Sequence, residues 1–125
     1  MGIKNPAKRQ TLANTYASDI THFGLATGAP GTSPANGNEL TGAGPEGTYA
    51  RVAVSNSAGT GGVRNWANGT LHLPATGTAY EATVLLLCSA ATGATVVDWE
   101  YLDDPIPVGP QGGVGTLSGV SYTQS

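Results

Sequence analysis

The chain has 125 residues, including 19 Gly and 8 Pro, and only 10% of its residues are charged. So many Gly and Pro residues interrupt long helices, which argues against a helical bundle and favours short strands joined by turns. The net charge of −3, with five basic residues in all, argues against a nucleic-acid-binding protein, which needs a basic surface. The length fits one domain that buries about two-thirds of its unfolded surface.

Neither the N-terminal segment nor any apolar run carries a targeting or membrane signal. Residues 1–6 are followed by no apolar stretch typical of a signal peptide, and position 6 is Pro rather than the Ser or Thr of a myristoylation site. No apolar run has the length of a membrane span. The single cysteine, Cys88, lies in an apolar run, which predicts a buried strand residue rather than a nucleophile. We expect folding in a reducing cytoplasm.

One helix is predicted near the N-terminus, over residues 6–19. Asn5 is a good N-cap, and Pro6 fits the first helical position. Lys8 and Arg9 lie in the first turn, where the helix dipole disfavours cations, so they are either solvated or contact an acidic neighbour. Apolar residues at helical spacing predict the buried face: Leu12, Ala13, Tyr16, Ala17 and Ile20.

Six strands are predicted after the helix. They cover residues 21–27, 49–55, 66–74, 81–89, 95–102 and 115–123. The segment 81–89 is the most apolar and predicts a central strand, whereas residues 57–63 are expected to be a flexible turn. Prolines in the segment 104–107 are expected to prevent regular pairing.

This pattern predicts a mainly β fold, an antiparallel β-sandwich or barrel with one short N-terminal helix and long Gly/Pro-rich loops. Residues 1–20 would form an N-terminal arm and helix, and residues 21–125 the β domain. The longest loop is expected between the first two strands and contains mostly Gly, Pro, Asn, Ser and Thr. A large neutral loop without a cluster of reacting groups is typical of a surface or assembly protein.

Four of the eight acidic residues lie close together in the sequence: Asp98, Glu100, Asp103 and Asp104. Carboxylate oxygens suit Ca²⁺, but the spacing lacks the pattern and the glycine of a known calcium loop. Alternation along a strand would place Asp98 and Glu100 on one face. We therefore expect a solvated strand edge that resists aggregation, with a cation site as the weaker alternative.

No arrangement typical of catalysis is visible. His22 and His72 have no Ser, Cys or Asp partner at motif spacing, and the glycine runs lack the Lys-Ser/Thr of a phosphate-binding loop. Glu39, Glu46 and Glu81 lie in separate segments, so nothing marks a pair of glycosidase carboxylates. The sequence predicts no enzyme, no cofactor and no metal.

The aromatic residues allow two interpretations. They are Tyr49, Trp66, Tyr80, Trp99 and Tyr101. Such side chains line the grooves of carbohydrate-binding modules. In a chain with a single Phe they are more simply expected to fill the core or a subunit interface.

The segment between positions 20 and 51 resembles a family of small virion proteins from tailed phages of the actinobacteriophage type. Members carry a pattern like "ITHVSLHTGDPG…ANEV.GG.YAR", followed by "…F.LPAGT" and "AATGG" segments. The corresponding residues here are Ile20-Thr21-His22-Phe23-Gly24-Leu25, Thr27-Gly28, Pro30-Gly31, Asn38-Glu39-Leu40, Gly42, Tyr49-Ala50-Arg51, the segment 70–78 and the segment 90–94. In this chain Ala26 and Ala29 replace a His and an Asp of the pattern, and the loop 32–47 is longer.

Members of this family are head decoration (minor capsid), minor tail or tail-fibre proteins. The resemblance implies a virion structural protein, which we expect to bind the outside of the head shell and to stabilise it. Its expected partners are the major capsid protein and copies of itself, as a homotrimer at three-fold positions, with no nucleic acid and no membrane. The alternative is a tail-fibre or minor tail protein that recognises a host surface. An enzyme such as a glycan depolymerase is a third, weaker interpretation.

The assembly contacts are expected in the N-terminal segment 2–9 and in the long loop 29–46. The candidate residues are Lys4, Lys8, Arg9, Pro30, Glu39, Glu46 and Arg51. Arg51 is expected to pair with Glu39 or Glu46 and so to fix the loop against the following strand.

Overall fold

The N-terminal helix forms where the sequence predicts it. In the computed structural model, which describes residues 2–32 and 36–125, α1 spans Pro6–Ser18. The Asn5 side chain caps this helix by accepting hydrogen bonds from the backbone N–H groups of Ala7 and Lys8. The buried face is narrower than predicted: Ala13 and Ala17 are buried, but Leu12 and Tyr16 are only half-buried.

The described residues form eleven strands. They are β1 (His22–Ala26), β2 (Ala43–Gly44), β3 (Gly47–Thr48), β4 (Val52–Ala53), β5 (Asn56–Ala58), β6 (Val63–Trp66), β7 (Gly69–Leu73), β8 (Tyr80–Cys88), β9 (Val96–Val108), β10 (Gly113–Leu117) and β11 (Ser121–Thr123). All the pairings between them are antiparallel.

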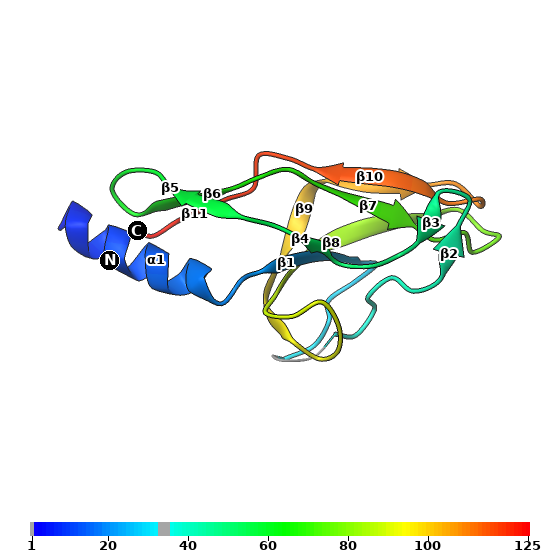
Figure 1. Ribbon diagram of the computed structural model, residues 1–125, viewed down its shortest axis with the longest axis horizontal. Helices are drawn as coiled ribbons and strands as arrows, with labels where there is room; N and C mark the ends of the chain where they lie inside the picture. Colours follow the sequence, from blue (N-terminus) through cyan, green and yellow to red (C-terminus); the bar gives the residue numbers. More distant parts are fainter. Residues whose placement is uncertain (1, 33–35) are drawn as a thin grey trace.

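The strands make two layers. One layer is the sheet β4-β1-β8-β9. The other consists of the pair β10-β7 and the sheet β11-β6-β5, which continue each other because β6 runs into β7 and β10 into β11. A hydrogen bond of 3.0 Å from the Trp66 N–H to the Val120 carbonyl joins the two parts. The molecule is elongated, with α1 and both chain ends at one end and the β2–β3 hairpin at the other (Figure 1).

The main core lies between these layers. It includes Phe23 and Leu25 from β1, Leu71 and Leu73 from β7, and Leu85 from β8. Ala17 and Ile20 belong to the same cluster, so the helical segment and the strands share one core. The predicted β-sandwich with one short N-terminal helix is therefore confirmed.

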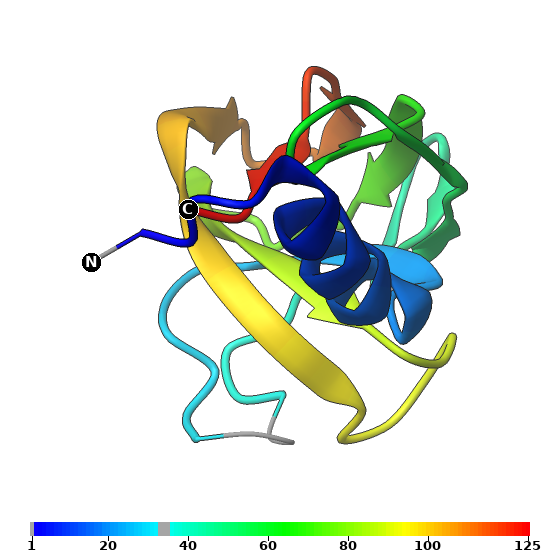
Figure 2. The ribbon, with the colours of Figure 1, turned by 90° about the vertical axis from the view of Figure 1, so that its left-hand side faces the viewer.

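β8 is central, as predicted, and both of its faces are buried. Ala82, Leu85 and Leu87 point to the main core, whereas Val84, Leu86 and Cys88 form a second cluster on the outer face of the sheet, with Ala26 and Val96. The members of the second cluster are at most 1% exposed. The chain after β1 covers them: Figure 2 shows this loop on one side of the sheet and the second layer of strands on the other. We call residues 27–32 and 36–42 the covering loop.

Three predictions about the strands are wrong. β9 continues through Pro105 and Pro107, because it is an edge strand and needs partners on one side only, and a register shift against β8 accommodates the irregularity. The expected single strand 115–123 is two strands, β10 and β11, which belong to separate sheets. The expected turn 57–63 is present but shorter, over residues 59–62, between the paired strands β5 and β6. The expected strand 49–55 shrinks to β4, since Arg51 turns inward instead of following a strand alternation.

Candidate functional site

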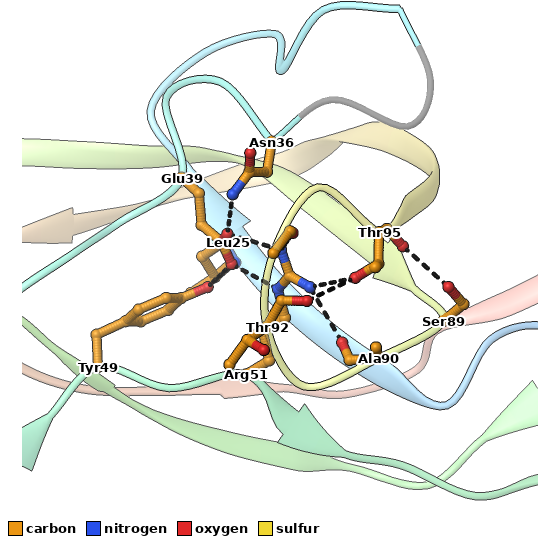
Figure 3. A network of polar contacts seen from close by, with 10 residues as sticks. Leu25, Asn36, Glu39, Tyr49, Arg51, Ser89, Ala90, Thr92 and Thr95 are labelled. Carbon is orange, nitrogen blue, oxygen red and sulfur yellow. Dashed lines mark hydrogen bonds and ion pairs between the residues drawn. The ribbon is translucent and has the colours of Figure 1, made fainter.

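Arg51 is the centre of a buried polar network that joins three segments of the chain. Its guanidinium makes a two-pronged contact with Glu39, with Nε–Oε2 and Nη2–Oε1 distances of 2.8 Å each. The Arg51 side chain is 2% exposed and that of Glu39 is 10% exposed. Figure 3 shows the two side chains facing each other below the covering loop. The predicted pairing of Arg51 with Glu39 is confirmed.

The remaining Arg51 donors hold the turn between β8 and β9. Nη1 donates to the Ala90 carbonyl at 3.0 Å and to the Thr95 Oγ1 at 2.7 Å, and Nη2 donates to the Gly93 carbonyl at 2.6 Å (Figure 3). Together with the two contacts to Glu39 these bonds use all five N–H donors of the guanidinium. One side chain therefore fixes the covering loop and the β8–β9 turn at the same time.

Tyr49 completes the network from the other side. Its hydroxyl donates to Glu39 Oε2 at 2.8 Å and accepts the backbone N–H of Leu25 at 3.0 Å. We call Glu39, Tyr49 and Arg51 the Arg51 network. It lies against Gly24 of β1, where a Cβ would stand 2.8 Å from the Tyr49 hydroxyl and 3.0 Å from Glu39 Oε2. Glycine at this position leaves the space that the network occupies.

The network changes the pKa values of its members. Burial by itself would raise the pKa of the Glu39 carboxyl, but hydrogen bonds from Arg51 and Tyr49 outweigh it, so this pKa is lowered from its ordinary 4.5. The hydrogen bonds to Glu39 raise the pKa of Arg51. Burial raises the pKa of the Tyr49 phenol. At neutral pH the pair is therefore an ionised Glu39 and a charged Arg51, with Tyr49 as a neutral donor.

Cys88 is buried near the Arg51 network. The thiol is fully buried in the second cluster, and burial raises its pKa to about 11 although the nearby Arg51 opposes the rise. A thiol that stays protonated and out of contact with solvent is unreactive. The predicted burial of Cys88 in a strand is confirmed.

The other expected contact residues do not meet in one site. Lys4 and Lys8 are exposed at the helical end of the molecule, and Glu46 is exposed at the β2–β3 end. Arg9 is used inside the chain, because its side chain donates to the carbonyls of Gly61 at 2.9 Å and Ile3 at 2.5 Å. Pro30 is buried rather than presented on the surface. Whether any of them contacts another protein stays a prediction.

A groove of about 540 Å³ runs between β9 and the β10–β11 part of the second layer. Its floor is largely aliphatic and is completed by Trp66, and its rim carries the four clustered carboxylates. The lining includes Trp66, Leu85, Leu87, Asp98, Glu100, Leu102, Asp103, Asp104, Ile106, Leu117 and Val120. We call it the β9 groove. The sequence showed its acidic rim but not the groove, because the floor comes from strands far apart in the chain.

Two tyrosines close the helical end of the β9 groove. The rings of Tyr16 and Tyr122 stack with a centroid distance of 3.8 Å. The Tyr16 hydroxyl donates to Asp98 Oδ2 at 2.5 Å. Burial, and then this hydrogen bond, raise the pKa of Tyr16, so the phenol stays protonated. The contact ties α1 to β9.

The described residues contain no group of three or more side chains able to hold a metal ion. His22 is beside the Thr21 hydroxyl, and His72 lies against the backbone of Gly47. Within the described part of the chain, no helix has the length and apolar character needed to cross a membrane. The two features that stand out in the described residues are therefore the fixed covering loop and the β9 groove.

Comparisons with known proteins found no relative of this chain. No protein-family model matches the chain, and no match was found among curated proteins or solved structures.

Proposed function

We propose that this chain is a structural protein of a tailed-phage virion that decorates the outside of the head shell. The partners in this proposal are the major capsid protein and further copies of the same chain, arranged as a symmetric oligomer. Many repeated contacts of moderate size would together hold the shell, as multivalent binding does.

The observation that carries the proposal is where the resembling residues lie. Glu39, Tyr49 and Arg51 belong to the pattern that resembles small virion proteins, and they meet in the Arg51 network. Residues that match in order and also depend on one another in space support the resemblance more strongly than scattered matches would. The network fixes a long surface loop, which is what a repeated contact surface needs.

Two energetic arguments, one on conformational entropy and one on charge burial, favour a binding surface. A loop that is already held by buried hydrogen bonds loses little conformational entropy when it contacts a partner. Few exposed charges also favour close packing, because burying an unpaired charge in an interface is costly.

Quantitative mass spectrometry of purified particles tests the proposal. A head decoration protein is expected in hundreds of copies per particle, in a fixed ratio to the major capsid protein. A handful of copies would instead support the tail-fibre or minor tail alternative. Absence from purified particles would reject both.

A further inference from the structure

Two tyrosines that are far apart in the sequence share one stacked contact. Tyr16 belongs to α1 and Tyr122 to β11, and their rings lie 3.8 Å apart at the centroids and 10° from parallel. Carbon atoms of one ring are therefore within van der Waals contact of the other ring. Among the aromatic contacts of the described residues this is the one that joins two phenols, because both others include a tryptophan.

The Tyr16 hydroxyl already has a proton acceptor. It donates to Asp98 Oδ2 at 2.5 Å, the length of a charge-assisted hydrogen bond. A phenol that loses an electron becomes strongly acidic, so a carboxylate at this distance takes the proton as the electron leaves. Asp98 is exposed and can pass the proton on to water. Tyr16 is therefore placed to form a neutral phenoxyl radical.

A small reagent can reach both phenols. Tyr16 and Tyr122 are half-buried and line the β9 groove. Tyr49 also donates to a carboxylate, that of Glu39, but no second phenol stacks on it in the described structure. A stacked phenol, a proton acceptor and access from the groove thus occur together at the Tyr16–Tyr122 pair.

The pair also joins the two ends of a chain that has no internal disulfide. Cys88 is the single cysteine and is a free thiol. A bond between positions 16 and 122 would enclose all but the terminal segments in one covalent loop. Cross-links that close long loops restrict the unfolded chain most. Such a bond would therefore stabilise the fold and fix α1 to β11.

We propose that Tyr16 and Tyr122 are an oxidation site at which a one-electron oxidant forms an intramolecular dityrosine cross-link. The oxidant takes one electron from each phenol, while the Tyr16 proton moves to Asp98 and the Tyr122 proton to water. The two radicals then form a carbon–carbon bond between ring carbons ortho to the oxygens. The hydrogen on each of these carbons moves to the oxygen of its own ring, which restores both phenols.

The chain loses two electrons and two protons in this reaction, and the oxidant gains the two electrons. The cross-link goes beyond the proposed function. It is measured on the purified chain, so its failure and the failure of the virion proposal are separate results.

Photo-oxidation of the purified chain by a ruthenium tris-bipyridyl complex with persulfate tests the proposal. The wild type is expected to gain dityrosine fluorescence, to lose the mass of two hydrogen atoms and to remain monomeric on a denaturing gel. Trypsin cleaves after Arg51 and Arg64, which lie between the two tyrosines in the sequence. Mass spectrometry of the digest is expected to show residues 10–51 joined to residues 65–125, with fragment ions that locate the bond at positions 16 and 122.

Conservative variants separate this pair from the other tyrosines. Tyr16→Phe and Tyr122→Phe keep an aromatic ring at each position but remove one phenol, and each is expected to lose the intramolecular product. The matched control is Tyr101→Phe, which removes an exposed phenol that contacts Trp99 instead of a tyrosine, and it is expected to react like the wild type. Circular dichroism of each variant checks that it is folded.

A further variant tests the proton acceptor. Asp98→Asn is expected to form the cross-link about tenfold more slowly, because a positioned group that takes a proton contributes at least that much. An unchanged rate would contradict the role given to Asp98.

Stability provides a second readout. The cross-linked wild type is expected to unfold at a higher urea concentration than the untreated chain. Tyr16→Phe treated in the same way is the control for oxidation of other side chains, and it is expected to show no such increase.

The proposal is overturned if the wild type forms no intramolecular product while Tyr101 is oxidised under the same conditions. It is equally overturned if either variant that lacks one phenol of the pair still forms this product, or if the bond maps to other positions.

Discussion

Arg51 shows how much one side chain can organise in a chain with few charges. Its five hydrogen bonds reach Glu39 on the covering loop and the turn after β8. The sequence predicted the pairing with a glutamate, because Arg51 and Glu39 were both part of the resembling pattern. It did not predict the contacts with Ala90 and Gly93, since those are backbone carbonyls and carry no side-chain signal.

Replacement of Arg51 should be among the most damaging single changes. Arg51→Ala leaves the Glu39 carboxylate buried without its partner, and loss of one member of a buried pair costs about 3–5 kcal/mol. Urea unfolding followed by circular dichroism measures the difference. Glu46→Ala is the control, because Glu46 is exposed and is expected to change the free energy of unfolding by less than about 0.5 kcal/mol. Equal stability of the two variants would contradict the role given to the network.

The network should also make the free energy of unfolding decrease at low pH. The pKa of Glu39 is lower in the folded state than its ordinary 4.5, so the unfolded chain binds the proton first as the pH falls. The stabilisation from the ionised carboxylate is therefore complete above the unfolded pKa and is lost as the pH decreases through the folded pKa. Urea unfolding at a series of pH values should show a shallower acid loss for Glu39→Gln than for the wild type. Parallel curves would show that this carboxyl is not a source of the acid sensitivity.

At the scale of elements, the covering loop acts as the second layer over the outer face of β8. It lies beside Val96 and Trp99 through Ala29, Gly31 and Thr32. A backbone hydrogen bond from the Leu40 N–H to the Leu25 carbonyl and a bridge between Ala26 and Glu39 attach it to β1. The neutral loop that the composition predicts thus also covers part of the core.

The reaction rate of the Cys88 thiol measures how often the covering loop opens. In the wild type it is fully buried and should react slowly with a thiol reagent under native conditions. In Arg51→Ala the covering loop and the β8–β9 turn lose their common anchor, so local opening becomes more frequent and the reaction faster. Absorbance of the released thiol product measures the rate, with Glu46→Ala as the control. An unchanged rate in Arg51→Ala would mean that other contacts hold the loop.

The sequence predicted the elements whose signals are local. The Asn5 cap and Pro6 located α1, and the long apolar run located the central strand β8. It failed where tertiary position decides: β9 tolerates Pro105 and Pro107 because it lies at an edge, which no local pattern reveals. The buried face of α1 is narrower than predicted, because Leu12 and Tyr16 are only half-buried while Ala13 and Ala17 are buried.

At the scale of the whole molecule, the surfaces are divided along the long axis. The basic N-terminal segment lies at the helical end (Figure 1). The Arg51 network fixes a loop over one face, and the β9 groove opens beside an edge strand. This division is what connects the fold to the proposed place in a larger assembly.

Electron cryomicroscopy of intact particles, with the protein located by its own density, tests the central claim most directly. The proposal predicts repeated copies on the outer surface of the head at three-fold positions, with the elongated sandwich recognisable in each. Particles in which the protein is absent, or is found only inside the shell, would contradict it.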